Sequence, residues 1–215
     1  QAASMMAGYC NLLWTPDIHR HKTNRSNIES FWLSWPTGVC ETLAAECHTA
    51  AWSGFALTHS HFCSKPVTMP EIWERTIATA NAADWDFTTW VPRAVVINLG
   101  TNDWHGVPHE TDWDEPMVWD FIVNFTQTYH DFVDRITSSV VYGPTTHVFV
   151  AVGPMTMGYL LPAQWVVGNA SEKGLKVHLL NQSGYSHGDC GHPSFNSDAV
   201  IAKDAAATIA RELNW

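Results

Sequence analysis

The stretch that decides the fold is Ala94-Val-Val-Ile-Asn-Leu-Gly-Thr-Asn-Asp103, in which a run of apolar, mostly β-branched residues leads directly into a polar turn. A continuous apolar run of this length is typical of a strand buried on both faces, and such strands occur mainly in parallel sheets that helices cover. Residues 147–152 and 175–180 form two further runs of this kind. The sequence therefore predicts a mostly parallel sheet.

Helical patterns separate these runs. Residues 114–138 place apolar side chains at spacings of three and four, which makes one apolar face of a long helix. The other expected elements are helices at 30–45, 70–83 and 196–213 and a short strand at 47–53. This alternation predicts an α/β fold, a three-layer α/β/α sandwich with helices on both sides of the sheet. In such folds the ligand site lies beyond the carboxyl ends of the strands.

Composition limits the classes of function. A chain of 215 residues with 46% hydrophobic residues can form one ordinary core, so we expect a single domain over residues 1–215. The formal charge of −10 opposes binding to phosphate backbones and anionic lipid, so we expect neither nucleic acid nor a membrane surface as partner. Charged residues are only 15% of the chain, while Trp occurs 12 times.

Cysteines and glycosylation sequons bear on the compartment. Five cysteines without any CxxC pair leave one or two disulfides open and argue against a zinc ribbon. Asn-x-Ser/Thr sequons begin at Asn24, Asn124, Asn169 and Asn181. These features predict a secreted, extracellular glycoprotein. The His-x-His pairs at 19–21 and 59–61 have no third fixed ligand nearby, so we expect no metal and no cofactor.

Two polar segments fall where an α/β sheet places its site. The Gly-Thr-Asn-Asp turn follows the strand at 94–99, and the Asn102 amide there can donate a hydrogen bond to an oxyanion. Near the C-terminus, Asp189-Cys-Gly-His192-Pro places a carboxylate three residues before an imidazole. Asp189 can accept from one ring nitrogen of His192 and fix the tautomer needed for a general base. The pattern lacks only a nucleophile.

These motifs resemble the SGNH (GDSL) hydrolase superfamily, which has a flavodoxin-like fold. Its first block is similar to Ala2-Ala-Ser4-Met-Met-Ala-Gly-Tyr9, its second to Ala51-Trp-Ser-Gly54, and its later blocks to the Asn102 turn and the Asp189/His192 pair. The resemblance implies a catalytic triad of Ser4, His192 and Asp189. It also implies an oxyanion hole formed by the Ser4 and Gly54 backbone N–H groups and the Asn102 side chain.

Within this superfamily the sequence is most similar to carbohydrate esterase family 2. The matching features are the Ser-Gly second block, Trp90-Val-Pro92 before the Gly-Thr-Asn-Asp strand, and His192-Pro193. The resemblance implies a serine esterase that removes O-acetyl groups from plant polysaccharides of the acetylxylan or glucomannan type. From their position beside the Asn102 turn, we expect Trp104 and His105 to line the substrate cleft, with the indole face stacking on a sugar.

The first block departs from the family pattern. The family has Gly-Asp before the nucleophile, whereas this chain has Ala2-Ala3, and the family places an apolar strand and a β-sandwich domain before that block. We therefore expect an N-terminally truncated esterase domain from which the β-sandwich is absent. Two alternatives stay open: a catalytically impaired glycan-binding pseudoenzyme of the same fold, and an SGNH lipase or lysophospholipase.

Overall fold

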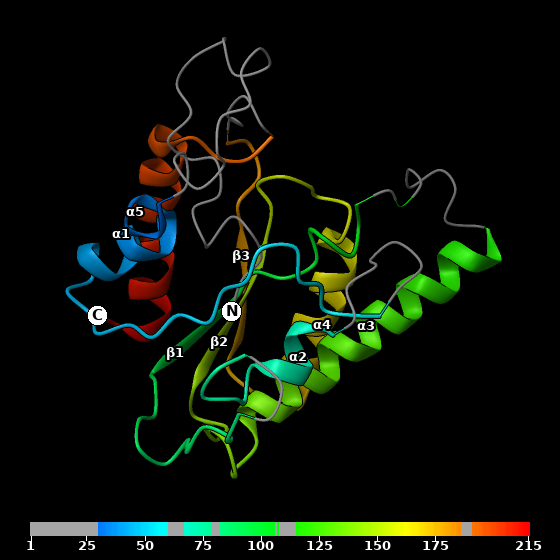
Figure 1. Cartoon of the computed structure of the whole chain (residues 1–215), viewed down its shortest axis with the longest axis horizontal. Coiled ribbons are helices and arrows are strands. Elements are labelled where there is room, and N and C mark those ends of the chain that lie inside the picture. The colour runs from blue at the N-terminus through cyan, green and yellow to red at the C-terminus, as the bar shows by residue number, and fades with distance from the viewer. Residues whose placement is uncertain (1–29, 60–66, 79–81, 106, 108–114, 186–190) are drawn as a thin grey trace.

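The centre of the structure is a parallel sheet of three strands, β1 (Ala94–Ile97), β2 (His147–Val152) and β3 (Val177–Asn181), in the order β1-β2-β3 (Figure 1). The computed structural model describes residues 30–59, 67–78, 82–105, 107, 115–185 and 191–215. All three strands lie where continuous apolar runs predict them, with ends shifted by a few residues at most. Both ladders are parallel, so all three carboxyl ends meet at one edge of the sheet.

One face of the sheet carries α2 (Met69–Ile72), α3 (Pro116–Thr137) and α4 (Leu160–Glu172). α3 connects β1 to β2 and α4 connects β2 to β3, the usual crossovers of a parallel sheet. The helical stripe predicted for residues 114–138 is confirmed, because its apolar residues are buried in α3. They pack on the β2 side chains that point to this face, Val148, Val150 and Val152.

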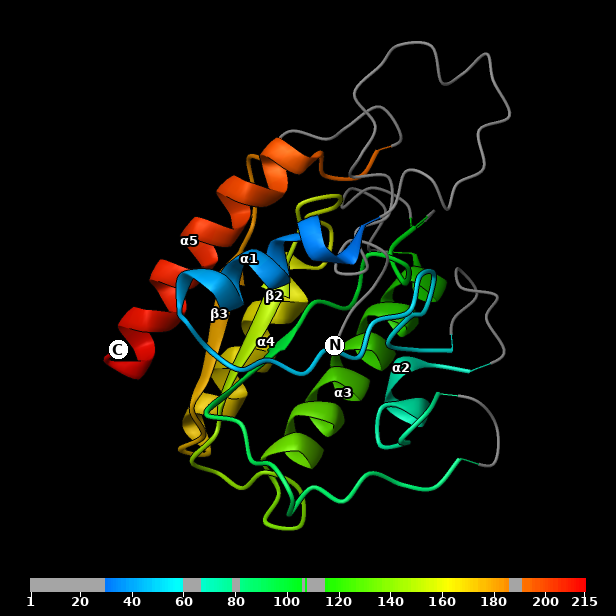
Figure 2. The ribbon, with the colours of Figure 1, turned by 60° about the vertical axis from the view of Figure 1, so that its left-hand side comes forward.

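The opposite face carries α1 (Trp35–Thr42) and α5 (Phe195–Leu213), so the molecule has the predicted three layers (Figure 2). These helices pack on Phe149 and Ala151, the alternate side chains of β2. α1 lies close against α5, because a Cβ atom added at Gly38 would come within 2.7 Å of the Ala202 Cβ. Pro36 lies in the first turn of α1, where a missing N–H costs nothing.

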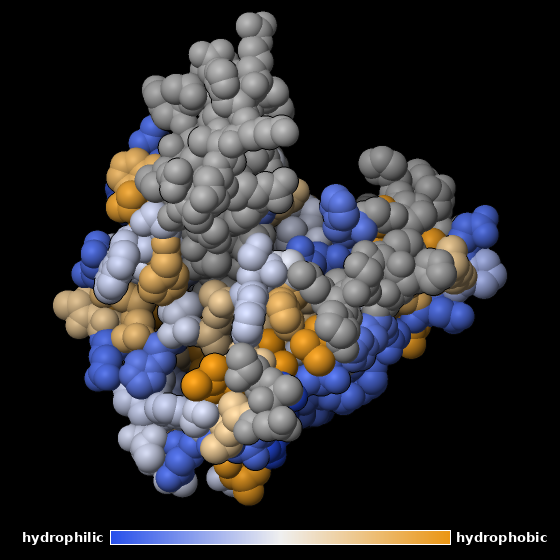
Figure 3. Space-filling model, in the orientation of Figure 1, coloured by the Kyte–Doolittle hydropathy of each residue, from blue (hydrophilic) through white to orange (hydrophobic). Residues whose placement is uncertain are grey.

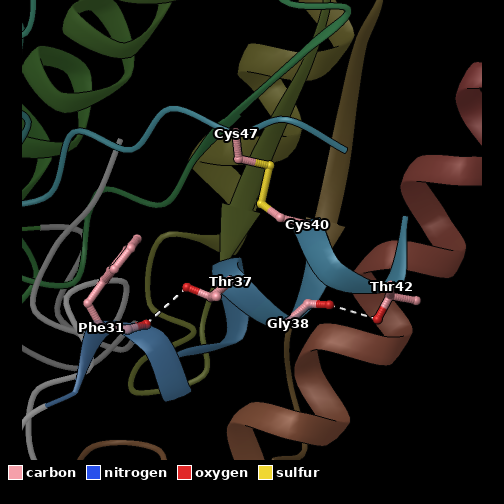
Figure 4. The surroundings of a disulfide bond; sticks show 6 residues. All are labelled: Phe31, Thr37, Gly38, Cys40, Thr42 and Cys47. Atoms are coloured by element: carbon pink, nitrogen blue, oxygen red, sulfur yellow. Dashed lines mark hydrogen bonds between the residues drawn. A yellow bond between two sulfur atoms is a disulfide. The ribbon is translucent and has the colours of Figure 1, made fainter. Parts of the chain in front are cut away.

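A disulfide ties the end of α1 to the segment that follows it (Figure 4). Cys40 and Cys47 are joined by an S–S bond of 2.11 Å across a separation of seven residues. Within α1, the Thr42 hydroxyl donates to the Gly38 carbonyl at 2.7 Å. The disulfide fixes where the chain turns back from α1 toward β1.

Two elements expected from the sequence differ in the structure, and one helix has no counterpart among the expectations. Residues 47–53 form no named strand and carry only a single bridge residue, Ala51. The helix expected at 70–83 ends at Ile72, because the chain then pairs with itself: Arg75 bridges Asp84 in antiparallel fashion. α4 was not predicted from the sequence. None of the described helices has the length and apolarity that a membrane crossing requires.

Candidate active site

The carboxyl end of β1 passes into a tightly held turn. The Asn98 side chain is fully buried and donates to the backbone oxygens of Ala151, at 3.3 Å, and Gly153, at 3.2 Å. Gly100 has a φ of +123°, and a Cβ atom there would lie 2.8 Å from the Tyr159 ring. The turn therefore requires glycine at this position for both conformation and space.

Asn102 and the Gly54 loop come together at this edge of the sheet. The Asn102 Nδ2 donates to the Phe55 carbonyl oxygen at 2.8 Å, and Phe55 directly follows Gly54. Gly54 has a φ of +81°, which L side chains adopt rarely. Because a side-chain amide carries two N–H groups, Asn102 keeps a second hydrogen for another acceptor. The structure thus brings together two of the residues expected to form the oxyanion hole.

The carboxylate of Asp103 locks the two loops to each other. It is fully buried and accepts hydrogen bonds at Oδ2 from the Leu57 N–H, at 2.9 Å, and at Oδ1 from the Thr58 N–H and hydroxyl, at 2.8 and 2.7 Å. Burial raises the pKa of Asp103, while these donors act to lower it. All of its partners lie within the fold, so Asp103 positions the loops and is not itself a reacting group.

His192 belongs to the segment of residues 191–194 that leads into α5. This segment lies on the side of the molecule where the strands end (Figures 1 and 2). His192 is half-buried, and the next residue, Pro193, is buried. The Ser194 hydroxyl caps α5 by accepting from the Ser197 N–H at 3.3 Å, which fixes the end of this loop. Ser4 and Asp189 lie outside the described residues, so the structure gives no distance between either of them and His192.

Trp104 corrects one expectation about the cleft. Its side chain is only 6% exposed and packs edge-to-face on Phe121 and Phe125 of α3, so it belongs to the core and offers no indole face to a sugar. His105, the next residue, is exposed, and its place in the cleft stays a prediction. The exposed indole beside Gly54 is that of Trp52, which is 43% exposed and stacks on Phe55 at 5.3 Å between ring centroids.

Known esterases resemble this chain in sequence. It is 27% identical over 197 residues to the cellulase/esterase CelE of Acetivibrio thermocellus, a match that covers 87% of this chain and 22% of that protein. It is 24% identical over 178 residues to an acetylxylan esterase/glucomannan deacetylase of Cellvibrio japonicus, covering 81% of this chain and 44% of that protein. The chain thus spans less than half the length of these relatives. No family model matches the sequence.

The same relationship appears in the fold. The structure of a family two carbohydrate esterase from Clostridium thermocellum in complex with cellohexaose superposes with a TM-score of 0.79 at 25% identity. The match covers 100% of this chain and 63% of that chain. By sequence and by fold, the chain is therefore related to the family 2 carbohydrate esterases, which are SGNH hydrolases.

Proposed function

We propose that this chain forms the hydrolytic part of a serine carbohydrate esterase that removes O-acetyl groups from plant polysaccharide. The observation that carries the proposal is that hydrogen bonds join the Gly54 loop to the Asn102 turn. Asp103 accepts from the N–H groups of Leu57 and Thr58, and Asn102 donates to the Phe55 carbonyl. These hydrogen bonds support the proposal, because a backbone N–H and a side-chain amide held together at the carboxyl edge of a parallel sheet can stabilise an oxyanion.

The reaction proceeds in two acyl transfers. Oriented by Asp189, His192 takes the proton of the Ser4 hydroxyl, and the Ser4 Oγ attacks the acetyl carbonyl carbon. The Ser4 and Gly54 N–H groups and the Asn102 amide hold the resulting oxyanion. When it collapses, the sugar oxygen leaves with the proton from His192. Water then attacks the acetyl-enzyme by the same route and releases acetate.

Acetate release from acetylated xylan, and hydrolysis of p-nitrophenyl acetate, test this assignment. Ser4→Ala lowers kcat by about 10³-fold or more, whereas Ser139→Ala, a matched change at an exposed serine, leaves it unchanged. Asn102→Ala lowers kcat by about 10²–10³-fold with little change in KM, because it removes a donor used mainly in the transition state. Equal rates for Ser4→Ala and the parent protein would refute the mechanism.

The same assays separate the alternatives. A pseudoenzyme binds acetylated xylan with equal affinity before and after Ser4→Ala and releases no acetate. A lipase or lysophospholipase hydrolyses long-chain p-nitrophenyl esters faster than the acetate. We expect neither result, because the relatives of this chain include an acetylxylan esterase/glucomannan deacetylase.

Trp52 replaces Trp104 as the proposed sugar platform. Its exposed indole stands next to the Gly54 loop, and an aromatic face with one polar edge suits a sugar ring. Trp52→Ala raises KM for acetylated xylan and leaves KM for p-nitrophenyl acetate unchanged. Trp165→Ala, at a similarly exposed indole on α4, provides the control. A KM unchanged for both substrates would remove Trp52 from the cleft.

Secretion and glycosylation also belong to the proposal. The Cys40–Cys47 disulfide suits an oxidising compartment. Three of the four sequons, at Asn124, Asn169 and Asn181, begin at exposed residues. Mass loss on treatment with an N-glycosidase, after expression of the protein through a eukaryotic secretory pathway, is the expected result. An unchanged mass would refute glycosylation.

A further inference from the structure

The residues at the start of α4 pack against both ends of the Asn102 turn. A Cβ atom added at Gly100, where the turn begins, would lie 2.8–3.0 Å from three atoms of the Tyr159 ring, so this ring lies directly on the Gly100 backbone. Just after the turn, the Trp104 ring lies 3.0 Å from the place of a Cβ atom added at Gly158. Two consecutive residues from a distant part of the sequence therefore enclose the turn.

A hydrogen bond from the main chain anchors the Tyr159 side chain in this place. Tyr159 is fully buried, and its hydroxyl oxygen accepts from the Gly153 N–H at 3.3 Å. Gly153 directly follows β2, and its carbonyl oxygen accepts from the Asn98 side chain at 3.2 Å. The phenol is therefore tied to the same residue that holds the carboxyl end of β1.

The hydroxyl of Tyr159 also acts on the residue that precedes Asn102. Burial raises the pKa of Tyr159 to about 12, whereas the Thr101 hydroxyl and the Gly153 N–H act to lower it. Tyr159 therefore stays a neutral phenol at neutral pH and keeps its proton for hydrogen bonding. Its ring contacts the turn at Gly100, and its hydroxyl acts on Thr101, which is itself buried.

The direction of the Asn102 amide depends on how firmly the turn is held. Its Nδ2 donates one hydrogen to the Phe55 carbonyl oxygen, and the second hydrogen is the one available to an oxyanion. A donor stabilises a transition state best when its direction is set before the reaction, and a displacement of about 1 Å can cost about 10²-fold in rate. Asp103 holds the turn to the Gly54 loop, and Tyr159 supports it from α4.

We propose that Tyr159 is a positioning residue for Asn102: its ring, anchored through the hydroxyl at Gly153, sets the direction of the oxyanion-binding amide. This inference rests on the esterase function proposed above. Tyr159 is fully buried, so it acts on the reaction only through the turn. A phenylalanine at this position keeps the ring but loses the anchor, so the ring and the turn that it supports can shift together.

The kinetics of Tyr159→Phe in two backgrounds test the proposal. In the parent protein, we expect kcat for p-nitrophenyl acetate to fall about tenfold and KM to change less than about twofold, because the loss is confined to the transition state. In the Asn102→Ala background, the same substitution should change kcat by less than about twofold, because the donor that Tyr159 positions is gone. An equal fall of kcat in both backgrounds, or an unchanged kcat in the parent background, would overturn the proposal.

Tyr129→Phe is the matched control. Tyr129 is also fully buried, and its hydroxyl donates to the Ile97 carbonyl oxygen of β1 at 3.3 Å. It lies on the inner face of α3, whose outward surface is largely hydrophilic over the middle of the helix (Figure 3). Each substitution removes one buried hydroxyl, so both should lower Tm by a similar amount, but only Tyr159→Phe should lower kcat. A parallel fall of kcat in both variants would overturn the proposal.

A second measurement needs no catalysis. The Asn102 side-chain amide gives a pair of cross-peaks in a two-dimensional proton–nitrogen spectrum, and Asn102→Ala identifies the pair by removing it. Tyr159→Phe should shift this pair, and Tyr129→Phe should leave it in place. An unmoved pair would overturn the proposal whatever the activity. A parent protein without Ser4-dependent activity would refute the proposed function, whereas a shifted pair would still support control of the Asn102 side chain by Tyr159.

Discussion

Replacement of Asp103 by Asn tests whether one buried carboxylate holds the candidate site together. Asn is nearly the same size and keeps one acceptor oxygen, which can still serve the two donors of Thr58. Its new amide group then faces the Leu57 N–H, which in the parent protein donates to Asp103 Oδ2. A buried backbone donor loses its acceptor, and the two remaining bonds lose their charge.

Loss of the acceptor for the Leu57 N–H costs about 1–3 kcal/mol, and loss of the charge in the two bonds from Thr58 adds to this cost. We therefore expect Asp103→Asn to lower the free energy of unfolding by roughly 2–4 kcal/mol. Urea unfolding followed by Trp fluorescence should show a midpoint lower by about 1–2 M. Asp134→Asn, which removes a solvent-exposed ion pair with Lys173, is the control and should leave the midpoint nearly unchanged. A midpoint for Asp103→Asn within about 0.2 M of the parent would refute the locking role.

Two further predictions concern stability. Gly100→Ala forces a methyl group into the Tyr159 ring at positive φ, so it should lower the free energy of unfolding by more than about 2 kcal/mol. Gly143→Ala, at positive φ with nothing within 4 Å, isolates the backbone strain, and an equal loss in both variants would contradict the steric argument. Burial, more than the neighbouring cations, lowers the pKa of both His147 and His178, whose rings meet at 2.9 Å between Nδ1 and Nε2. The fold therefore resists protonation, and the free energy of unfolding should fall as pH drops below about 6.5; His147→Gln should reduce this slope, and an unchanged slope would contradict the assignment.

The elements that the sequence predicts well are those whose pattern is long and regular. The strand runs at 94–99 and 147–152 and the stripe at 114–138 recur over enough residues to define their period. The sequence pattern does not predict α4, because the exposed Leu161 and Trp165 obscure the helical spacing of its buried residues. The helix expected at 70–83 fails because pairing between Arg75 and Asp84 overrides a short local pattern.

The candidate site also contains features that the sequence predicts and features that it does not. The resemblance to the SGNH hydrolases implies that Asn102 and Gly54 lie together, and Asn102 donates a hydrogen bond to the carbonyl of Phe55, the residue after Gly54. The position of Trp104 next to the Asn102 turn predicts a place in the cleft, whereas its side chain is buried in the core. Sequence position next to a motif does not predict the direction of a side chain. The partners of Asp103 lie 45 and 46 residues away in sequence, and no local pattern indicates such a contact.

The central claim is that Ser4 is a nucleophile activated by His192. A fluorophosphonate probe measures this directly, since a serine activated by a general base displaces fluoride and forms a stable ester that intact-mass analysis detects. We predict one added phosphonyl group per chain, located on Ser4 by peptide mapping and abolished by His192→Ala. An unlabelled protein, or a label on any residue other than Ser4, would contradict the account.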